Sequence, residues 1–267
     1  MKVFLNGSLL APEDARIDVT DRGLTLGDGL FETIAVRGGK PARLEAHLAR
    51  LSDGARALGF PDPFWAGDLT AAANSVIEAN GITEGVLRLT LTRGPGPRGV
   101  APPDPARPTL LITGVSRALD PAPPASAVIA AATRRNEHSA LSRIKSTNFL
   151  DGILAAREAA ERGADDALLL NGAGNLAEAS AANLFLVIGG EAVTPPVADG
   201  ALPGVMRADV IRELPAAERT LGPGELNRAE EAFLTNALGV RALVTVEGAP
   251  IGDGKPGPVT KKAQGLV

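Results

Sequence analysis

The chain has 267 residues and a net charge of −4 at pH 7, and hydrophobic residues make up 45% of it. This composition is typical of a folded protein with one large domain or two smaller ones, and it excludes disorder as the dominant state. The sequence has no Cys and two His, which excludes a disulfide framework, a thiolate nucleophile and a multi-His zinc site. An acidic balance with only 3% aromatic residues argues against a nucleic-acid partner.

The N-terminal residues MKVFLNGSLL lack the apolar core and the cleavage site of a signal peptide. No apolar run approaches the roughly 18 residues that a membrane-spanning helix needs. We therefore expect a cytoplasmic protein that has no membrane partner.

The first half of the chain predicts a β-hairpin followed by further strands and two helices. Asn6-Gly7 is a strong signal for a two-residue hairpin turn. Apolar residues recur with a helical period between residues 44 and 58. The predicted strands are residues 3–5, 8–10, 30–36, 85–92 and 109–115. The predicted helices are residues 44–58 and 69–79, and Gly81 is expected to end the second of them.

A proline-rich segment divides the chain into two domains. Residues 117–126, RALDPAPPAS, predict an interdomain linker, because prolines remove backbone donors and fix φ. The N-terminal domain is then residues 1–116, and the C-terminal domain is residues 127–267. In the second half, strands are predicted over residues 127–133, 167–170, 183–187 and 242–246, and helices over residues 148–162, 205–214 and 225–233. This order is typical of an α+β protein rather than of regular βαβ units.

Gly94, Gly96 and Gly99 match the spacing GxGxxG after a predicted strand. A dinucleotide-binding fingerprint needs a helix to begin at that point, so that its N-terminus meets the pyrophosphate. The following residues VAPPDPARP cannot be helical, so we interpret the segment as a stiff loop that carries Arg98.

Lys145 is the first candidate for chemistry, and it is the one lysine between positions 41 and 254. It lies in SRIKSTNFL, ahead of a predicted helix that Thr147 or Asn148 can cap. The field of a helix N-terminus and partial burial both disfavour an ammonium ion, and a neutral amine is what imine formation requires. A solvated surface lysine is the alternative.

Glu178 lies among small and apolar residues in NLAEASAANLFLV. We expect its carboxylate to be partly buried and to need a partner, such as a protonated ring nitrogen or an arginine. A carboxylate on the surface of a hairpin is the alternative.

Pro203-Gly204 precedes a predicted helix whose first-turn N–H groups, on Val205 and Met206, predict an anion site. Arg50 on the helix over residues 44–58 can supply a bidentate charge. An ordinary helix start and a solvated arginine are the alternatives. Together these residues supply an imine-forming lysine, a carboxylate for a ring nitrogen and a phosphate cradle, as in a pyridoxal-phosphate enzyme.

The sequence resembles the fold-type IV, or class IV, pyridoxal-phosphate aminotransferases and their aminodeoxychorismate lyase relatives. Six segments carry the resemblance in family order: DRGLTLGDGLFET (21–33), RLEAHLARL (43–51), IKSTNFL (144–150), EASAANLF (178–185), LPGVMR (202–207) and IGDGKPGPVTKKAQ (251–264). The resemblance implies a two-domain α+β fold with a small N-terminal α/β domain and a larger, β-rich pseudo-barrel domain with helices. It also implies an enzyme with pyridoxal 5′-phosphate as its cofactor and no metal.

The resemblance implies a role for each matching residue. Lys145 is expected to form the internal aldimine and to shuttle the proton, and Glu178 is expected to pair with the pyridine nitrogen. The further expected cofactor contacts are Arg50, Ser180, Leu202, Val205 and Met206. The family usually has Thr in place of Met206 and Tyr in place of Phe149, so two hydroxyl groups are lost here.

The substrate residues leave two activities open. In D-amino-acid aminotransferases the substrate carboxylate meets Tyr, Arg and His, and this chain has Phe31, Arg98 and Val100 at those positions. The segment TNAL, with Asn236, and the GPGPRG loop resemble aminodeoxychorismate lyase, which converts 4-amino-4-deoxychorismate to 4-aminobenzoate and pyruvate. The C-terminal segment 251–264 instead favours an aminotransferase of the D-amino-acid or branched-chain type.

We therefore predict an aminotransferase that moves an amino group from an amino acid to a 2-oxo acid, with the lyase as the alternative. A dimeric scaffold without activity is a further alternative, and the presence of both Lys145 and Glu178 argues against it. In the family, the loop that carries Arg98 reaches the active site of the neighbouring subunit. The resemblance thus implies a homodimer with shared sites.

Overall fold

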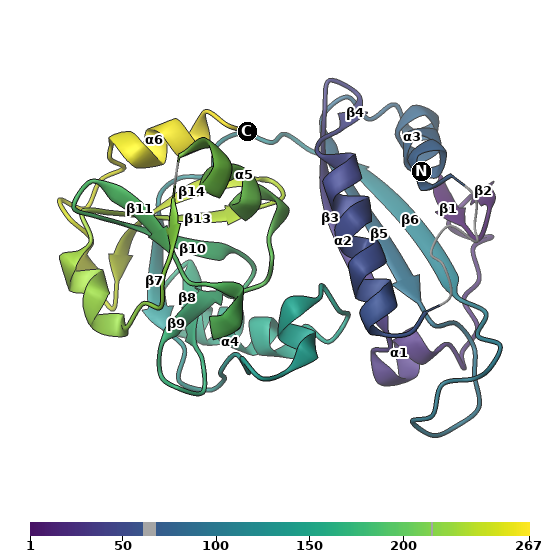
Figure 1. Ribbon diagram of the computed structural model, residues 1–267. Coiled ribbons are helices and arrows are strands. Elements are labelled where there is room, and N and C mark those ends of the chain that lie inside the picture. The colour runs from purple at the N-terminus through teal and green to yellow at the C-terminus, as the bar shows by residue number, and fades with distance from the viewer. Residues whose placement is uncertain (61–67, 215) are drawn as a thin grey trace. The chain divides into compact units, whose positions relative to one another are not determined.

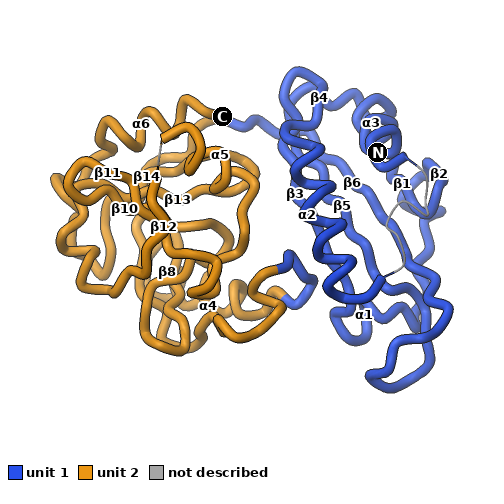
Figure 2. Tube along the Cα trace, in the orientation of Figure 1, with its two compact units in different colours: residues 1–119, 144–148 blue, residues 120–143, 149–267 orange. Residues whose placement is uncertain are grey.

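The computed structural model describes residues 1–60, 68–214 and 216–267. They form two compact units (Figure 2): unit 1 is Met1–Leu119 with Ile144–Asn148, and unit 2 is Asp120–Arg143 with Phe149–Val267. The segment Ile144–Asn148, which the sequence analysis placed in the C-terminal domain, thus clusters with unit 1. The fold class is α+β, which confirms the prediction.

Unit 1 is built on a six-stranded sheet in the order β2-β1-β6-β5-β3-β4, in which all neighbours are antiparallel. Its strands are β1 (Val3–Leu5), β2 (Ser8–Leu10), β3 (Gly29–Arg37), β4 (Lys40–Pro41), β5 (Gly85–Thr92) and β6 (Thr109–Ser116). Its helices are α1 (Arg22–Leu26), α2 (Leu44–Ala57) and α3 (Leu69–Asn80). Figure 1 shows α2 running along the sheet beside β3.

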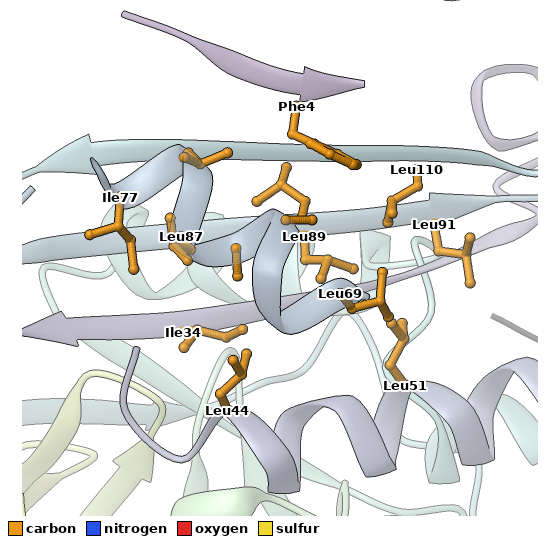
Figure 3. Packing of buried hydrophobic residues seen from close by; sticks show 14 of the residues in the cluster. Phe4, Ile34, Leu44, Leu51, Leu69, Ile77, Leu87, Leu89, Leu91 and Leu110 are labelled. Atoms are coloured by element: carbon orange, nitrogen blue, oxygen red, sulfur yellow. The ribbon is translucent and has the colours of Figure 1, made fainter. Parts of the chain in front are cut away.

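The core of unit 1 lies between the sheet and the helices α2 and α3 (Figure 3). Leu87, Leu89 and Leu91 point from β5 into this core, because alternate residues of a strand face the same side. The residues between them, including Arg88, therefore lie on the other face of the sheet. Gly81 adopts a left-handed conformation with φ 59° and ends α3, as the sequence predicts.

Unit 2 is built on a nine-stranded sheet in the order β12-β11-β10-β13-β14-β7-β8-β9, with β15 paired to β14. Its strands are β7 (Ala125–Ile129), β8 (Asp166–Leu170), β9 (Leu176–Ala179), β10 (Asn183–Ile188), β11 (Glu191–Thr194), β12 (Ala217–Glu218), β13 (Glu231–Asn236), β14 (Gly239–Val246) and β15 (Ala249–Pro250). Its helices are α4 (Leu150–Glu161), α5 (Val205–Glu213) and α6 (Pro258–Gln264), with short 3-10 helices at Ala140–Arg143, Val197–Asp199 and Pro223–Arg228.

The helix predicted over residues 225–233 is wrong. Residues Pro223–Arg228 form a 3-10 helix, and Glu231–Asn236 form strand β13 between β10 and β14. Phe233 stacks on Phe185 of β10 with 4.9 Å between the ring centroids. Burial between two strands thus overrides the helical propensity of the local sequence.

Helix α4 has an apolar stripe that this chain leaves exposed. Leu150, Ile153 and Leu154 are spaced so that they share one face of the helix, and they are 70%, 57% and 38% exposed. The residues that α4 buries are Ala155 and Ala159, which pack close to the sheet.

Within the described ranges, no helix combines the length and the apolar character needed to cross a membrane.

Candidate active site

The predicted site residues are divided between the two units. Unit 1 holds Phe31, Arg50, Arg98 and Lys145. Unit 2 holds Glu178, Ser180, Leu202, Val205, Met206 and Asn236.

Lys145 lies on a segment that extends the edge of β3. The Phe31 N–H donates to the Lys145 carbonyl at 2.9 Å, and Leu30 and Ser146 form an antiparallel bridge. The Lys145 side chain is half-buried, and its Nζ lies 4.4 Å from the centre of the Phe31 ring. The β3 backbone thus fixes the lysine segment, and the lysine amine lies over the face of the Phe31 ring.

The predicted cap of α4 by Thr147 or Asn148 is wrong. The N-cap position is Phe149, which makes no capping bond from its side chain. Thr147 Oγ1 and Asn148 Nδ2 instead donate to the Gly27 carbonyl at 2.7 and 2.8 Å. Gly27 lies between the end of α1 and the start of β3, so the two side chains supply the hydrogen bonds to its carbonyl. These two residues tie the lysine segment to the start of β3.

Arg50 is held by a buried carboxylate. Its Nε and Nη2 bind Glu32 at 2.8 and 2.6 Å, and Nδ1 of His47 lies 2.7 Å from Glu32 Oε2. The Glu32 side chain is 1% exposed. Burial raises the pKa of Glu32, but hydrogen bonds from His47 and Arg50 outweigh it, so the pKa lies below its usual range. An ionised Glu32 fixes the plane of the Arg50 guanidinium, as a phosphate anchor needs.

Arg88 is a candidate that the sequence analysis missed. Its guanidinium carbon lies 3.5 Å from the centre of the Phe31 ring, so Arg88 and Lys145 both contact this ring. Burial lowers the pKa of Arg88, although the side chain reaches solvent. The available signal was that Arg88 is the one charged residue in the strand GVLRLTLT.

Arg98 lies in an exposed loop between β5 and β6, as predicted. Within the described ranges it forms no ion pair. Val100, which stands where D-amino-acid aminotransferases have His, lies in the same loop and is 87% exposed. The glycine-rich segment is not followed by a helix, so the rejection of a dinucleotide fingerprint is confirmed.

Glu178 in unit 2 uses both carboxylate oxygens. Oε1 lies 2.9 Å from Arg135 Nε, and Oε2 accepts the Leu202 N–H at 2.9 Å. Asn183 Nδ2 donates to Oε2 at 3.4 Å and to the Leu202 carbonyl at 2.9 Å. The partly buried carboxylate therefore has the arginine partner that the sequence analysis named as one alternative, and it is joined to the segment before α5.

The N-terminus of α5 has the form of an anion site. Gly204 occupies the N-cap and supplies no side chain to the first-turn N–H groups of Val205 and Met206. A Cβ at Gly204 would lie 2.0 Å from Asn183 Oδ1, so the close approach requires glycine here. The Met206 side chain is buried in the apolar cluster with Phe185, so its predicted contact to an anion depends on its backbone N–H.

Ser180 and Asn236 have structural partners of their own. Ser180 Oγ donates to Asp166 Oδ1 at 2.6 Å. Asn236 ends β13, and its Oδ1 accepts the Leu238 N–H at 2.9 Å in the turn to β14. Their roles toward cofactor and substrate stay predictions.

Pyridoxal phosphate fits the donor sets of the two units. In unit 2, a carboxylate for a ring nitrogen is hydrogen-bonded to the segment that leads into an uncapped helix N-terminus. In unit 1, the amine and the Glu32-bound arginine supply groups for an aldehyde and a phosphate. This combination corresponds to the reactive group, the ring nitrogen and the phosphate of that cofactor.

Comparisons with known proteins give consistent results. The sequence model of the family described as amino-transferase class IV matches residues 29–245. A D-alanine aminotransferase of Bacillus licheniformis is 28% identical over 99% of this chain and 95% of its own. The branched-chain amino acid aminotransferase of Escherichia coli matches with a TM-score of 0.91 and 28% identity, covering 98% of this chain and 92% of that one. A 4-amino-4-deoxychorismate lyase of Pseudomonas aeruginosa matches with a TM-score of 0.84 and 34% identity, covering 99% and 97%.

Proposed function

The chain belongs to the class IV aminotransferase family, and from this premise we propose that it transfers an amino group from an amino acid to a 2-oxo acid. It is an enzyme, and its cofactor is pyridoxal 5′-phosphate. The observation that carries the proposal is Glu178, whose carboxylate forms an ion pair with Arg135 and accepts a hydrogen bond from the backbone that leads into α5. A carboxylate fixed in this way suits a protonated pyridine nitrogen better than it suits a solvated surface.

Each predicted residue has a task in the proposal. The bound cofactor supplies an electron sink for the substrate carbon that loses its proton. Lys145 binds the cofactor aldehyde and moves that proton with its amine. Glu178 keeps a proton on the ring nitrogen. Arg50 and the first-turn N–H groups of Val205 and Met206 bind the phosphate.

Two arginines of unit 1 supply charges for an anionic substrate. Arg98 has a free-standing guanidinium on its loop and is our candidate for the substrate's α-carboxylate. Arg88 packs on the Phe31 ring, which the Lys145 amine also contacts, so we assign Arg88 to a second anionic group. Amino acids and 2-oxo acids with two carboxylates are therefore the preferred substrate class to test.

The lyase is the second candidate function. The solved lyase is more similar in sequence than the branched-chain aminotransferase, at 34% against 28% identity, whereas its TM-score is lower, at 0.84 against 0.91. Aminodeoxychorismate also carries two carboxylates, so the two arginines suit either activity.

One assay separates the two activities. The protein is incubated with D- and L-amino acids and with 2-oxoglutarate or pyruvate, and the new amino acid is quantified. In parallel, release of pyruvate from 4-amino-4-deoxychorismate is measured without an amino acceptor. Amine transfer supports the proposal, and pyruvate release without amine transfer assigns the lyase instead.

We further propose a homodimer with shared active sites. The exposed stripe of Leu150, Ile153 and Leu154 on α4 is typical of a surface that another subunit covers, because monomers rarely expose such contiguous apolar patches. Unit 1 also exposes Val19 and Leu24, at 79% and 72%. Light scattering at the assay concentration should give the mass of a dimer, and a fully active monomer would contradict this proposal.

A further inference from the structure

Arg22 binds the loop that carries Arg98. The residue begins α1 and is 3% exposed. Its Nη1 donates to the carbonyls of Gly99 and Ala101 at 2.9 and 3.3 Å, and its Nη2 donates to the Val100 carbonyl at 2.9 Å. One guanidinium thus binds three consecutive carbonyls, directly after Arg98 in the chain.

A partly buried carboxylate, that of Asp28, holds Arg22 in place. Arg22 Nε donates to Asp28 Oδ2 at 2.9 Å, and Arg93 Nε donates to the same oxygen at 2.7 Å. Burial raises the pKa of Asp28, but hydrogen bonds from Arg93 and Arg22 outweigh it, so the pKa lies below its usual range. Asp28 therefore remains ionised and offsets the buried charges.

Arg22 also contacts the beginning of the loop, through its backbone and through its side chain. The backbone N–H of Arg22 donates to the Gly94 carbonyl at 2.9 Å. A Cβ at Gly96 would lie 3.0 Å from Arg22 Cδ, so the loop packs closely on the arginine stem. Arg22 thus contacts the loop on both sides of Arg98, which itself is exposed.

We propose that Arg22 is a positioning residue for substrate binding, which acts by fixing the backbone from which Arg98 projects. The inference rests on the proposed role of Arg98 as the carboxylate anchor. An exposed loop that is ordered in advance loses less conformational entropy when it binds a ligand. The Arg22 side chain donates four hydrogen bonds from three nitrogen atoms, three to the loop carbonyls and one to Asp28. A lysine ammonium has three N–H donors on a single atom, so lysine cannot replace arginine here.

Arg22→Lys is the first test, because it keeps the charge beside Asp28 and removes the fork. We expect KM for an amino acid to rise about ten-fold, the size of one charge-assisted hydrogen bond, with little change in kcat. A primary arylalkylamine, which has no carboxylate, should react as with the wild-type enzyme. Arg93→Lys is the matched control, because Arg93 shares Asp28 but donates to Leu58 rather than to the loop.

The double variant Arg22→Lys/Arg98→Ala separates positioning from a general structural role. If Arg22 acts through Arg98, adding Arg22→Lys to Arg98→Ala should change kcat/KM for the amino acid no further. A further loss of the same size in the Arg98→Ala background would overturn the proposal. Gly96→Ala is a milder variant, in case Arg22→Lys does not fold, because it displaces the arginine stem without removing its charge.

Hydrogen exchange on the substrate-free protein gives a readout that does not depend on turnover. Amides of residues 98–101 should exchange faster in Arg22→Lys and in Gly96→Ala than in the wild type or in Arg93→Lys. Unchanged exchange would overturn the proposal even if the enzyme is an aminotransferase. If the wild type transfers no amine and releases no pyruvate, the proposed function fails, whereas the exchange result still decides whether Arg22 orders the loop.

Discussion

Replacing Glu178 by Gln tests the carboxylate on which the cofactor assignment depends. Oε1 lies 2.9 Å from Arg135 Nε, and Oε2 accepts from the Leu202 N–H at 2.9 Å. Glutamine has the same shape, but its amide has one acceptor oxygen and one NH2 donor. The neutral amide loses the ion pair with Arg135, and in one of its two orientations its NH2 group also faces the Leu202 N–H, which is itself a donor.

The structure sets the size of the expected effects. The side chains of Arg135 and Glu178 are 17% and 12% exposed, so water screens their interaction only partly. A hydrogen bond to a charged group contributes about 1.5–3 kcal/mol, and the free energy of unfolding of unit 2 should fall by about that amount. Catalysis should suffer separately, because a neutral amide no longer keeps the ring nitrogen protonated. Loss of one preorganised electrostatic partner costs about 10²–10³-fold in kcat.

Steady-state kinetics give kcat, urea unfolding gives the free energy, and the visible absorbance of the purified variant shows whether the cofactor still binds. Glu230→Gln is the matched control, because Glu230 is exposed and also accepts two backbone N–H groups, from Gly189 and Gly190. The control should keep wild-type kcat. A Glu178→Gln enzyme with unchanged kcat would refute the assigned role, and unchanged stability would refute the hydrogen-bond argument.

Three further predictions concern unit 1. Lys145→Ala should abolish turnover, and it should abolish the covalent attachment of cofactor that mass spectrometry detects after borohydride reduction. Circular dichroism should show that the variant keeps its fold. Turnover at the wild-type rate in this variant would contradict the role of Lys145. Arg98→Ala should lower kcat/KM for amino acids by about ten- to two-hundred-fold, because losing one charge-assisted hydrogen bond costs about 1.5–3 kcal/mol. The variant should leave kcat/KM for arylalkylamines unchanged. Equal losses of kcat/KM on both substrate types would show that Arg98 shapes the loop instead. The pKa of Glu32 is lowered in the folded protein from its ordinary value of 4.5, because hydrogen bonds from His47 and Arg50 outweigh burial. Its contribution to stability is therefore complete above that value and is lost as the pH falls through the lowered pKa. As the pH falls from about 6 to about 3, the free energy of unfolding should decrease more steeply for the wild type than for Glu32→Gln. An equal dependence on pH in the two proteins would show that the bonds from His47 and Arg50 do not lower the pKa of Glu32.

Local signals predicted the elements that depend on local chemistry. Asn6-Gly7 forms the hairpin turn with φ values of 47° and 91°, and Gly81 ends α3. Strand β13 could not be predicted in this way, because its stability comes from pairing with β10 and β14. A local sequence pattern does not show which distant strands will pair with a segment.

The same distinction applies to the candidate site. Glu178 was singled out because small apolar residues surround it, and the structure shows its carboxylate partly buried with an arginine partner. The contact of Arg88 with Phe31 was missed, because it depends on the register in which Phe31 lies opposite Thr90 and Arg88 opposite Thr33. A single strand sequence contains no information on that register.

The assignment of Ile144–Asn148 to unit 1 has a consequence for biosynthesis. The chain enters unit 2 at Asp120, returns to unit 1 for five residues and then leaves it again at Phe149. A ribosome must therefore translate the first 148 residues before unit 1 can complete its β3 edge and place Lys145 on it. Cleavage within residues 117–126 would release an N-terminal fragment that has Phe31 and Arg50 but lacks its lysine. The two units therefore pack as separate bodies, but neither is encoded by one continuous stretch of the gene. We expect circular permutation or domain exchange at this proline-rich segment to fail unless residues 144–148 are transferred together with unit 1.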